Sequence, residues 1–287
     1  MKGAFYQEKG AFTIGDSPAI PPAEGEARLA VAYCGVCGTD VHIYHGVMDA
    51  RIGPPQVIGH EASAVVQEIG PGVTNVKVGD RVAVRPLQFG EPHPFDKGNA
   101  HVGKNLKFIG IDKAGAFQES WTEPAYTLHH LPDALSLAHG ALIEPLAVAC
   151  HDVKIGRVKA GENVLVMGGG PIGVLIAFVL REKGANVMVA EVNETRLKML
   201  AEWGFEVVNP VKEKLEQKVS DFTDSAMADV VFEVSGSAAA VEAMTTVVNA
   251  RARIVMVAIH GGGPRPVDLF KFFWSDIELL GARLYLV

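Results

Sequence analysis

The feature that most constrains the fold of this chain is a glycine-rich loop between an apolar segment and a helical segment. The apolar segment, residues 164–167, reads Val-Leu-Val-Met. The loop residues are Gly168, Gly169, Gly170, Pro171, Ile172 and Gly173. In such a strand-turn-helix unit, Gly168 allows the tight turn, Gly170 lets the backbone approach a bound group, and Gly173 lets the helix pack closely on the sheet. The pattern predicts the opening unit of a doubly wound parallel sheet.

The segments after residue 155 alternate between apolar strand patterns and helical patterns. The expected strands are 163–167, 187–191, 206–208, 229–234, 253–259 and 277–285, and the expected helices are 172–183, 194–203 and 238–249. This alternation predicts a parallel sheet with helices on both faces. Before residue 155, short β-type runs are separated by Gly, Pro and Asp turns. We therefore expect an α/β fold, with a β-rich domain over 1–154, a doubly wound domain over 155–287, and an apolar helix over 136–153 between them.

The composition predicts a soluble globular protein. Hydrophobic residues make up 48% of the 287 residues, and the formal net charge is −7. No segment approaches the ~20 apolar residues of a membrane span, and the N-terminus has no apolar signal region. We therefore expect a cytoplasmic protein with no membrane partner. The acidic balance and the lack of a Lys/Arg cluster argue against a nucleic-acid partner.

The cysteines favour a reducing compartment, because there are only three of them, Cys34, Cys37 and Cys150. Cys34 and Cys37 have the spacing of a thiol redox pair, but such pairs usually open a helix, whereas this one follows the apolar run 29–33. Redox exchange is therefore disfavoured, and Cys34 is expected to be a small buried residue.

The glycine loop also predicts where a nucleotide binds. A helix N-terminus attracts phosphate groups, so the candidate residues for a dinucleotide are Gly168, Gly170, Pro171, Ile172 and Gly173. The alternative is a glycine turn that serves packing alone.

A carboxylate after the next strand indicates which dinucleotide is bound. Glu191 follows the loop at about the 20-residue offset where an acidic residue accepts hydrogen bonds from the adenosine ribose hydroxyls. Its charge would repel a 2′-phosphate, and the adjacent Val192 and Asn193 bring no cation. NAD is therefore preferred to NADP, with Arg196 as the counterargument.

Three residues upstream of the loop have the chemistry of a catalytic zinc site. Zinc binds Cys sulfur, His nitrogen and carboxylate oxygen, and three protein ligands leave one position open for substrate. Cys37, His60 and Glu144 would supply these ligands, although each taken singly has an ordinary structural explanation. Glu144 stands within the apolar run 141–148, where an unpaired carboxylate would be costly. A metal together with a hydride carrier indicates alcohol oxidation.

Four segments in order, 35–42, 59–61, 143–146 and the glycine loop, resemble the zinc-dependent medium-chain alcohol dehydrogenases. Within that family the chain is most similar to the polyol, threonine and sugar-acid dehydrogenase branch, in which a Glu-Pro motif supplies the third ligand position. The resemblance covers essentially the whole chain. It implies a GroES-like catalytic domain followed by a Rossmann NAD-binding domain.

The resemblance further implies a ligand set and a proton path. One catalytic zinc per chain would be held by Cys37, His60 and Glu144, the last directly or through water, with Glu61 as a near or exchangeable ligand. The proton-relay and orienting residues, which form the candidate catalytic set, are Thr39, His42 and Asp40. The implied reaction is reversible oxidation of a secondary alcohol on a polyol, sugar acid or related small molecule.

The chain departs from the family pattern at a second zinc site. Many relatives hold a structural zinc with four cysteines, and the corresponding positions here are Phe89, Pro92, Phe95 and Gly103. We expect the lobe to be kept, its zinc to be absent, and Phe89, Phe95 and the local prolines to pack in its place. A different metal site at His93 and His101 is disfavoured, because no thiolates accompany them.

The chain also departs from the pattern after its final expected strand. Relatives continue past this point with a segment that completes the catalytic domain, so we expect either a truncated chain or a partner subunit that fills the gap. The apolar stretch 279–284 is suited to pair with a second subunit, which predicts a homodimer or homotetramer.

Two alternatives to the zinc-dependent dehydrogenase remain. One is a zinc-free NAD(P)H reductase of the same two-domain build, which is disfavoured because it has no need for the combined ligand motifs. The other is a non-catalytic remnant that binds nucleotide.

Overall fold

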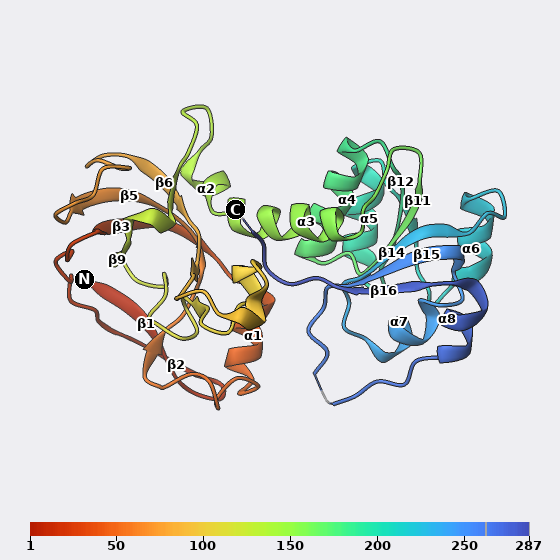
Figure 1. Cartoon of the computed structure of the whole chain (residues 1–287), viewed down its shortest axis with the longest axis horizontal. Coiled ribbons are helices and arrows are strands. Elements are labelled where there is room, and N and C mark those ends of the chain that lie inside the picture. Colours follow the sequence, from red (N-terminus) through yellow and green to blue (C-terminus); the bar gives the residue numbers. More distant parts are fainter. Residues whose placement is uncertain (262, 287) are drawn as a thin grey trace. The chain divides into compact units, whose positions relative to one another are not determined.

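The structure is a computed structural model that describes residues 1–261 and 263–286. The chain divides into two compact units, Met1–Pro145 and Leu146–Tyr285 (Figure 1). Helix α3 (Ile143–Ile155) spans this division, and the domain boundary at residue 154 stays a prediction. No helix in the described ranges is long and apolar enough to cross a membrane.

The first unit is built on antiparallel sheets. Its largest sheet has the order β10-β6-β5-β3-β9, a second has the order β2-β1-β4, and β7 pairs with β8. The strands are β1 (Lys2–Glu8), β2 (Ala11–Asp16), β3 (Glu26–Gly35), β4 (Gln56–Val57), β5 (Glu61–Ile69), β6 (Arg81–Val84), β7 (Leu87–Gln88), β8 (Lys107–Phe108), β9 (Ser120–Pro124) and β10 (Leu128–His130). The short helices are α1 (Gly38–Tyr44), η1 (Pro94–Asp96), η2 (Ala100–Val102), η3 (Ala125–Thr127) and α2 (Leu137–Gly140).

Alternating side chains of the largest sheet form the core of this unit. Ala27 and Leu29 of β3 pack with Ala62, Ala64 and Val66 of β5, and all five are buried. A period of two places such residues on one face of a strand. The β-rich organisation expected for this half of the chain is therefore confirmed.

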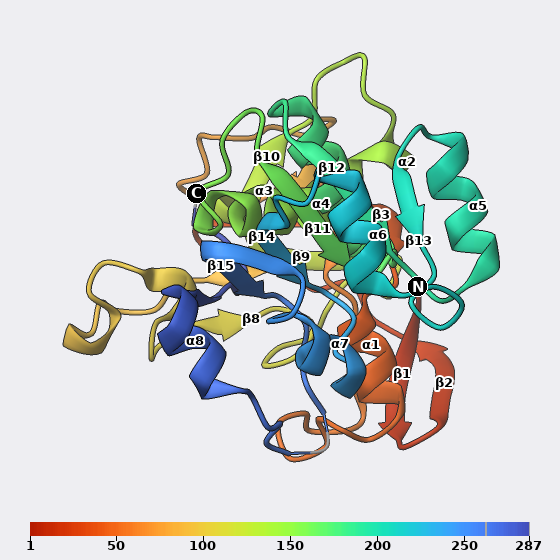
Figure 2. The same cartoon turned by 90° about the vertical axis from the view of Figure 1, so that its right-hand side faces the viewer.

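The second unit contains a six-stranded parallel sheet with the order β13-β12-β11-β14-β15-β16. Its strands are β11 (Asn163–Met167), β12 (Asn186–Ala190), β13 (Glu206–Val208), β14 (Ala228–Glu233), β15 (Val248–Met256) and β16 (Glu278–Gly281). Its further helices are α4 (Pro171–Glu182), α5 (Glu194–Glu202), α6 (Leu215–Phe222), α7 (Ala238–Ala243) and α8 (Leu269–Ser275). Strands β11 to β15 are labelled in Figure 2.

Successive residues of the central strands enter two separate cores. Val164 and Val166 of β11 pack with residues of α3, α4 and α5, whereas Leu165 and Met167 pack with residues of α6 and α7. Figure 1 shows α4 and α5 on one face of the sheet and α7 on the other. A strand buried on both faces reads as a continuous apolar run. The predicted doubly wound α/β fold is confirmed.

Two expected helices differ from the observed elements. The helix expected over 238–249 ends at Ala243, and Val248 already pairs with Ala228 in the sheet. The β-branched run that leads to Val248 favours a strand over a helix. The helix expected over 136–153 is divided into α2 and α3, with Pro145 in the first turn of α3, where its missing N–H removes no helical hydrogen bond.

Candidate active site

Three potential metal ligands converge in the first unit. One ligand atom each from Cys37, His60 and Glu61 lies within 4.8 Å of the other two. His60 is 2% exposed and Glu61 8%, while Cys37 is half-buried. A thiol, an imidazole and a carboxylate form a donor set that suits zinc.

The pairing of β3 with β5 brings these residues together. Gly35 at the end of β3 lies opposite Glu61 at the start of β5. Cys37 comes two residues after Gly35, and His60 comes directly before Glu61, so both lie near this pair. A Cβ atom on Gly35 would lie 2.3 Å from the Glu61 carboxylate oxygen Oε2. Gly59 adopts a φ of +94°, and a Cβ atom there would lie 2.6 Å from the Phe117 ring. Both glycines are therefore required for the approach of the ligands.

Burial shifts the pKa of each ligand group in the direction that favours its neutral form. Burial, followed by the nearby Glu61 charge, raises the pKa of the Cys37 thiol to about 12, against hydrogen bonds from Thr39. Burial lowers the pKa of His60 to about 4 and raises the pKa of Glu61, whose carboxylate accepts a hydrogen bond from Cys37. A bound divalent cation would reverse this preference for Cys37, because it stabilises the thiolate.

Asp40 orients two of the three ligands. Its Oδ2 atom accepts a hydrogen bond of 2.9 Å from the Cys37 backbone N–H, and its Oδ1 atom lies 3.7 Å from Nδ1 of His60. Oδ1 and Nδ1 are both buried and have no hydrogen-bond partner among the described residues. An imidazole whose Nδ1 faces a carboxylate presents Nε2 to a metal. These two unsatisfied atoms fit a metal site in which a bound cation draws the ligands closer, so that Asp40 Oδ1 and His60 Nδ1 come within hydrogen-bond distance.

The other predicted residues of this unit lie outside the cluster. Glu144 is buried in the first turn of α3, but its carboxylate is not part of the group formed by the three converging ligands. Thr39 and His42 are both half-buried on α1. Thr39 hydrogen-bonds the Cys37 sulfur. The metal-binding role of Glu144 and the proton-relay role of Thr39 and His42 stay predictions.

The glycine loop forms part of a pocket in the second unit. The pocket has a volume of about 440 Å³ and lies at the carboxyl ends of β11, β12 and β14. Gly168 adopts a φ of +119°, and a Cβ atom on Gly173 would lie 1.8 Å from the Gly168 carbonyl oxygen. These two positions therefore exclude larger residues. Pro171 and Ile172 begin α4, with Gly170 as its N-cap.

Glu191 ties the glycine loop to the end of β12. Its Oε2 atom accepts a hydrogen bond of 2.9 Å from Gly169 N, and its Oε1 atom accepts hydrogen bonds from Val192 N and Asn193 N at 2.7 and 2.9 Å. Burial opposes ionisation, but these backbone donors and Arg196 outweigh it and lower the pKa of Glu191. Arg196 also lines the pocket, with Nη1 3.5 Å from Glu191 Oε2.

Two serines of the pocket wall were missed by the sequence analysis. Ser235 and Ser237 follow β14 and line the pocket opposite Glu191. The sequence could have indicated them, because β14 is adjacent to β11 in the parallel sheet. Small polar residues after such a strand face the crevice that the glycine loop also lines.

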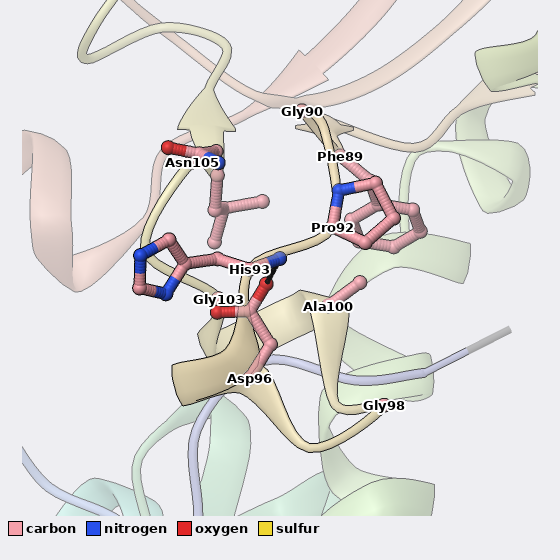
Figure 3. Close-up of a pocket in the computed structure, with 10 residues that line it drawn as sticks. Phe89, Gly90, Pro92, His93, Asp96, Gly98, Ala100, Gly103 and Asn105 are labelled. Carbon is pink, nitrogen blue, oxygen red and sulfur yellow. Dashed lines mark hydrogen bonds between the residues drawn. The ribbon is translucent and has the colours of Figure 1, made fainter.

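The lobe that lacks the four cysteines is held by hydrogen bonds. Asp96 Oδ2 accepts from His93 N at 3.1 Å and Asp96 Oδ1 accepts from Lys104 N at 2.8 Å, beside a cavity of about 250 Å³ that Phe89, Pro92 and Gly103 help to line (Figure 3). The expectation that Phe95 packs in the lobe is wrong, because its side chain is 68% exposed. A short 3₁₀ helix turns this ring toward solvent, and Asp96 on the same turn supplies the contacts.

Two further lobe residues, Phe89 and His101, are at least partly buried. The Phe89 ring lies 4.8 Å from the Arg85 guanidinium. His101, the other histidine of the lobe, is buried. Within the described ranges, no group of three metal-binding side chains gathers in the lobe.

Comparisons with known proteins place the chain in a family. The alcohol dehydrogenase GroES-like domain model matches residues 23–133, and the zinc-binding dehydrogenase model matches residues 171–286. The chain is 52% identical to 2-dehydro-3-deoxy-L-galactonate 5-dehydrogenase from Pseudoalteromonas atlantica over 99% of its own length and 84% of the relative's.

Solved structures with bound nicotinamide cofactors are similar across the whole chain. A zinc-binding dehydrogenase from Sinorhizobium meliloti bound to NADP has a TM-score of 0.91 and 27% identity. An alcohol dehydrogenase from E. coli complexed with NADH has a TM-score of 0.91 and 28% identity. In both cases 99% of this chain and 84% of the other are covered. The chain belongs to the zinc-type medium-chain dehydrogenases, in their polyol branch.

Proposed function

We propose that this dehydrogenase oxidises a secondary hydroxyl group of a sugar acid or related polyol to a ketone, with NAD as hydride acceptor and zinc at the Cys37 cluster. The observation that carries the proposal is the convergence of Cys37, His60 and Glu61 within 4.8 Å of one another. The zinc-free reductase has no use for such a buried donor set. A sugar acid stands first among substrates because of the 52% identical relative, which acts on 2-dehydro-3-deoxy-L-galactonate.

The residues of the chain prepare a metal site with an open position. A zinc ion bound there supplies Lewis-acid chemistry toward a hydroxyl oxygen, and a bound nicotinamide accepts the hydride. Cys37 and His60 would hold the metal, with Glu61 or Glu144 as the third ligand. Asp40 Oδ1 faces His60 Nδ1 at 3.7 Å, and a shift of the ring that closes this distance would fix the proton on Nδ1 and direct Nε2 to the metal. Thr39 Oγ1 receives the substrate proton, and His42 passes it on toward solvent.

NAD is proposed over NADP on the contacts of Glu191. Its ionised carboxylate lines the pocket where the adenosine ribose is expected, and it would repel a 2′-phosphate. The two similar structures carry NADP in one case and NADH in the other. The relatives therefore do not decide between NAD and NADP, and the choice for this chain rests on its own residues.

A homodimer or homotetramer is proposed on the exposed edge of the second unit. Strand β16 is the outermost strand of its sheet, and its Leu279 is 48% exposed. On α8, just before β16, Phe270, Phe273 and Trp274 are each more than 60% exposed. An open strand edge beside exposed aromatic side chains is typical of an interface between two copies of a chain.

The test of the proposed function is NAD reduction with a panel of sugar acids and polyols. We expect turnover with at least one member of the panel, and its loss by at least about a hundredfold in Cys37→Ser. Cys34→Ser is the matched control, because Cys34 lies three residues before Cys37, at the end of β3, and outside the ligand group. NADH binding without turnover on any alcohol would favour the non-catalytic remnant.

A further inference from the structure

A buried glutamate at the carboxyl edge of the parallel sheet has no part in the chemistry described above. Glu233 is the last residue of β14, and its side chain is 0% exposed. It pairs with Met167 of β11 on one side and with Met256 of β15 on the other. The carboxylate therefore lies between the glycine loop and the segment after β15, behind the nucleotide pocket.

One carboxylate oxygen of Glu233 organises the loop that follows it. Oε1 accepts hydrogen bonds from Ser235 N at 3.0 Å, from the Ser235 hydroxyl at 2.7 Å and from Gly236 N at 2.9 Å. Ser235 in turn hydrogen-bonds the Ser237 hydroxyl at 3.1 Å. A carboxylate that accepts several donors fixes a loop more firmly than a neutral acceptor does.

The rest of Glu233 holds the segment after β15. Its backbone oxygen accepts from Val257 N at 2.9 Å and Ala258 N at 3.1 Å. Its Oε2 atom lies 2.9 Å from Nε2 of His260, at contact distance but without hydrogen-bond alignment. Because the carboxylate is fully buried, removal of His260 would leave Oε2 without the polar group that faces it.

These contacts determine the shape of one wall of the nucleotide pocket. Ser235 and Ser237 line the pocket, whereas Glu233 and His260 do not. A Cβ atom on Gly168 would lie 3.0 Å from Ser235 N, so the two loops are in close apposition. Gly236 has a φ of +69°, and a Cβ atom on it would lie 3.2 Å from the Ile259 carbonyl oxygen. A shift of the Ser235 loop would therefore change both the pocket wall and the segment that carries His260.

We propose that Glu233 and His260 are positioning residues for the nicotinamide half of the dinucleotide. In a doubly wound sheet the two nucleotide halves lie on either side of the switch between the first strand and its neighbour. Glu191 at the end of β12 marks the adenosine side, so the loops after β14 and β15 lie on the side of the second nucleotide. This inference rests on the proposed use of NAD.

The test compares a ligand that has only the adenosine half with one that has both halves. Affinities for AMP, by calorimetry, and for NADH, by fluorescence, are measured on Glu233→Ala, His260→Ala, Glu233→Gln and the double variant Glu233→Gln/His260→Ala. Glu242→Ala, an exposed glutamate on α7, is the matched control. Thermal unfolding verifies that each variant is folded.

We expect Glu233→Ala and His260→Ala to weaken NADH binding and to raise KM for NAD about tenfold. AMP binding should weaken clearly less, by about threefold at most, although Ser235 and Ser237 share a pocket with Glu191. Glu233→Gln should lose less NADH affinity than Glu233→Ala, because its amide oxygen can accept the same three donors, although less firmly than the carboxylate does. The double variant should bind NADH better than His260→Ala alone, since no buried charge is left without its partner. A merely structural role would lower stability without this rescue.

Other outcomes overturn the inference. Wild-type NADH affinity in both alanine variants, or equal losses for AMP and NADH, would show that the pair does not position the second nucleotide. If Glu233→Ala does not fold, His260→Ala and the double variant decide the question. A wild-type protein that binds neither ligand contradicts the proposed function itself, which separates the two failures.

Discussion

At the scale of single residues, Glu191 has an observed structural role and a proposed binding role. Its carboxylate ties Gly169 to the end of β12 through a backbone hydrogen bond, and its charge lines the pocket where we propose that the ribose binds. Glu191→Gln keeps one acceptor oxygen but removes the charge, so we expect the preference for NAD over NADP to narrow about tenfold. Glu191→Ala should in addition raise KM for both cofactors. Initial rates with both cofactors test this, and an unchanged preference in both variants would refute the ribose role.

Asp152 predicts a pH dependence of stability. It is fully buried on α3, neither carboxylate oxygen has a hydrogen-bond partner among the described residues, and burial raises its pKa to about 7. The folded state therefore binds this proton more tightly than the unfolded state, and the contribution to stability is lost as pH rises from about 4 to about 7.

Replacement of this carboxylate should remove that loss. At pH 8 we expect Asp152→Ala to be more stable than wild type by a few kcal/mol, on the order of 2 to 4, with the difference shrinking below pH 4. Urea unfolding across this pH range measures it. Asp133→Asn, at an exposed position, is the control and should not differ from wild type. A constant difference at all pH values would count against the titration of Asp152.

At the scale of elements, the β3–β5 ladder positions the residues of the proposed metal site. Gly35 lies opposite Glu61, and a Cβ atom there would overlap the Glu61 carboxylate. We therefore expect Gly35→Ala to displace Glu61 and to lower zinc affinity at least about tenfold, while the fold is kept. Gly38→Ala is the matched control, because a Cβ atom at Gly38 would contact nothing within 4 Å. Competitive zinc titration against a chelator measures both, and equal affinities would contradict this account.

The same scale separates what the sequence could predict from what it could not. The strands of the second unit were recognisable because a parallel strand buried on both faces is a continuous apolar run, as in β11. The length of α7 could not be recognised in this way. The end of this helix depends on where the next strand begins to pair in the sheet, and Val248 already pairs with Ala228. The metal cluster could be predicted by residue type, but the contact of Asp40 with His60 depends on side-chain direction, and so does the Glu233–His260 pair.

At the scale of the whole molecule, the exposed edge beside β16 predicts association of two copies. Leu279 on β16 and Phe273 on α8 are both exposed in the single chain. We expect Leu279→Lys/Phe273→Ser to convert the proposed oligomer to a monomer, because it places a charge on the strand edge and removes an exposed aromatic side chain. Light scattering after size exclusion measures the mass. Phe95→Ser, which removes another exposed aromatic side chain, in the lobe of the first unit, is the control and should leave the mass unchanged. An unchanged mass in the double variant would exclude this interface.

The measurement that tests the central claim most directly is the zinc content of the same samples used for NAD reduction. We predict about one zinc per chain in wild type and in Cys34→Ser, and less than about half an equivalent, with no turnover, in Cys37→Ser. Glu144→Gln measured alongside shows whether that residue contributes a ligand. Wild-type protein that oxidises an alcohol with NAD while it contains no zinc would contradict the proposal.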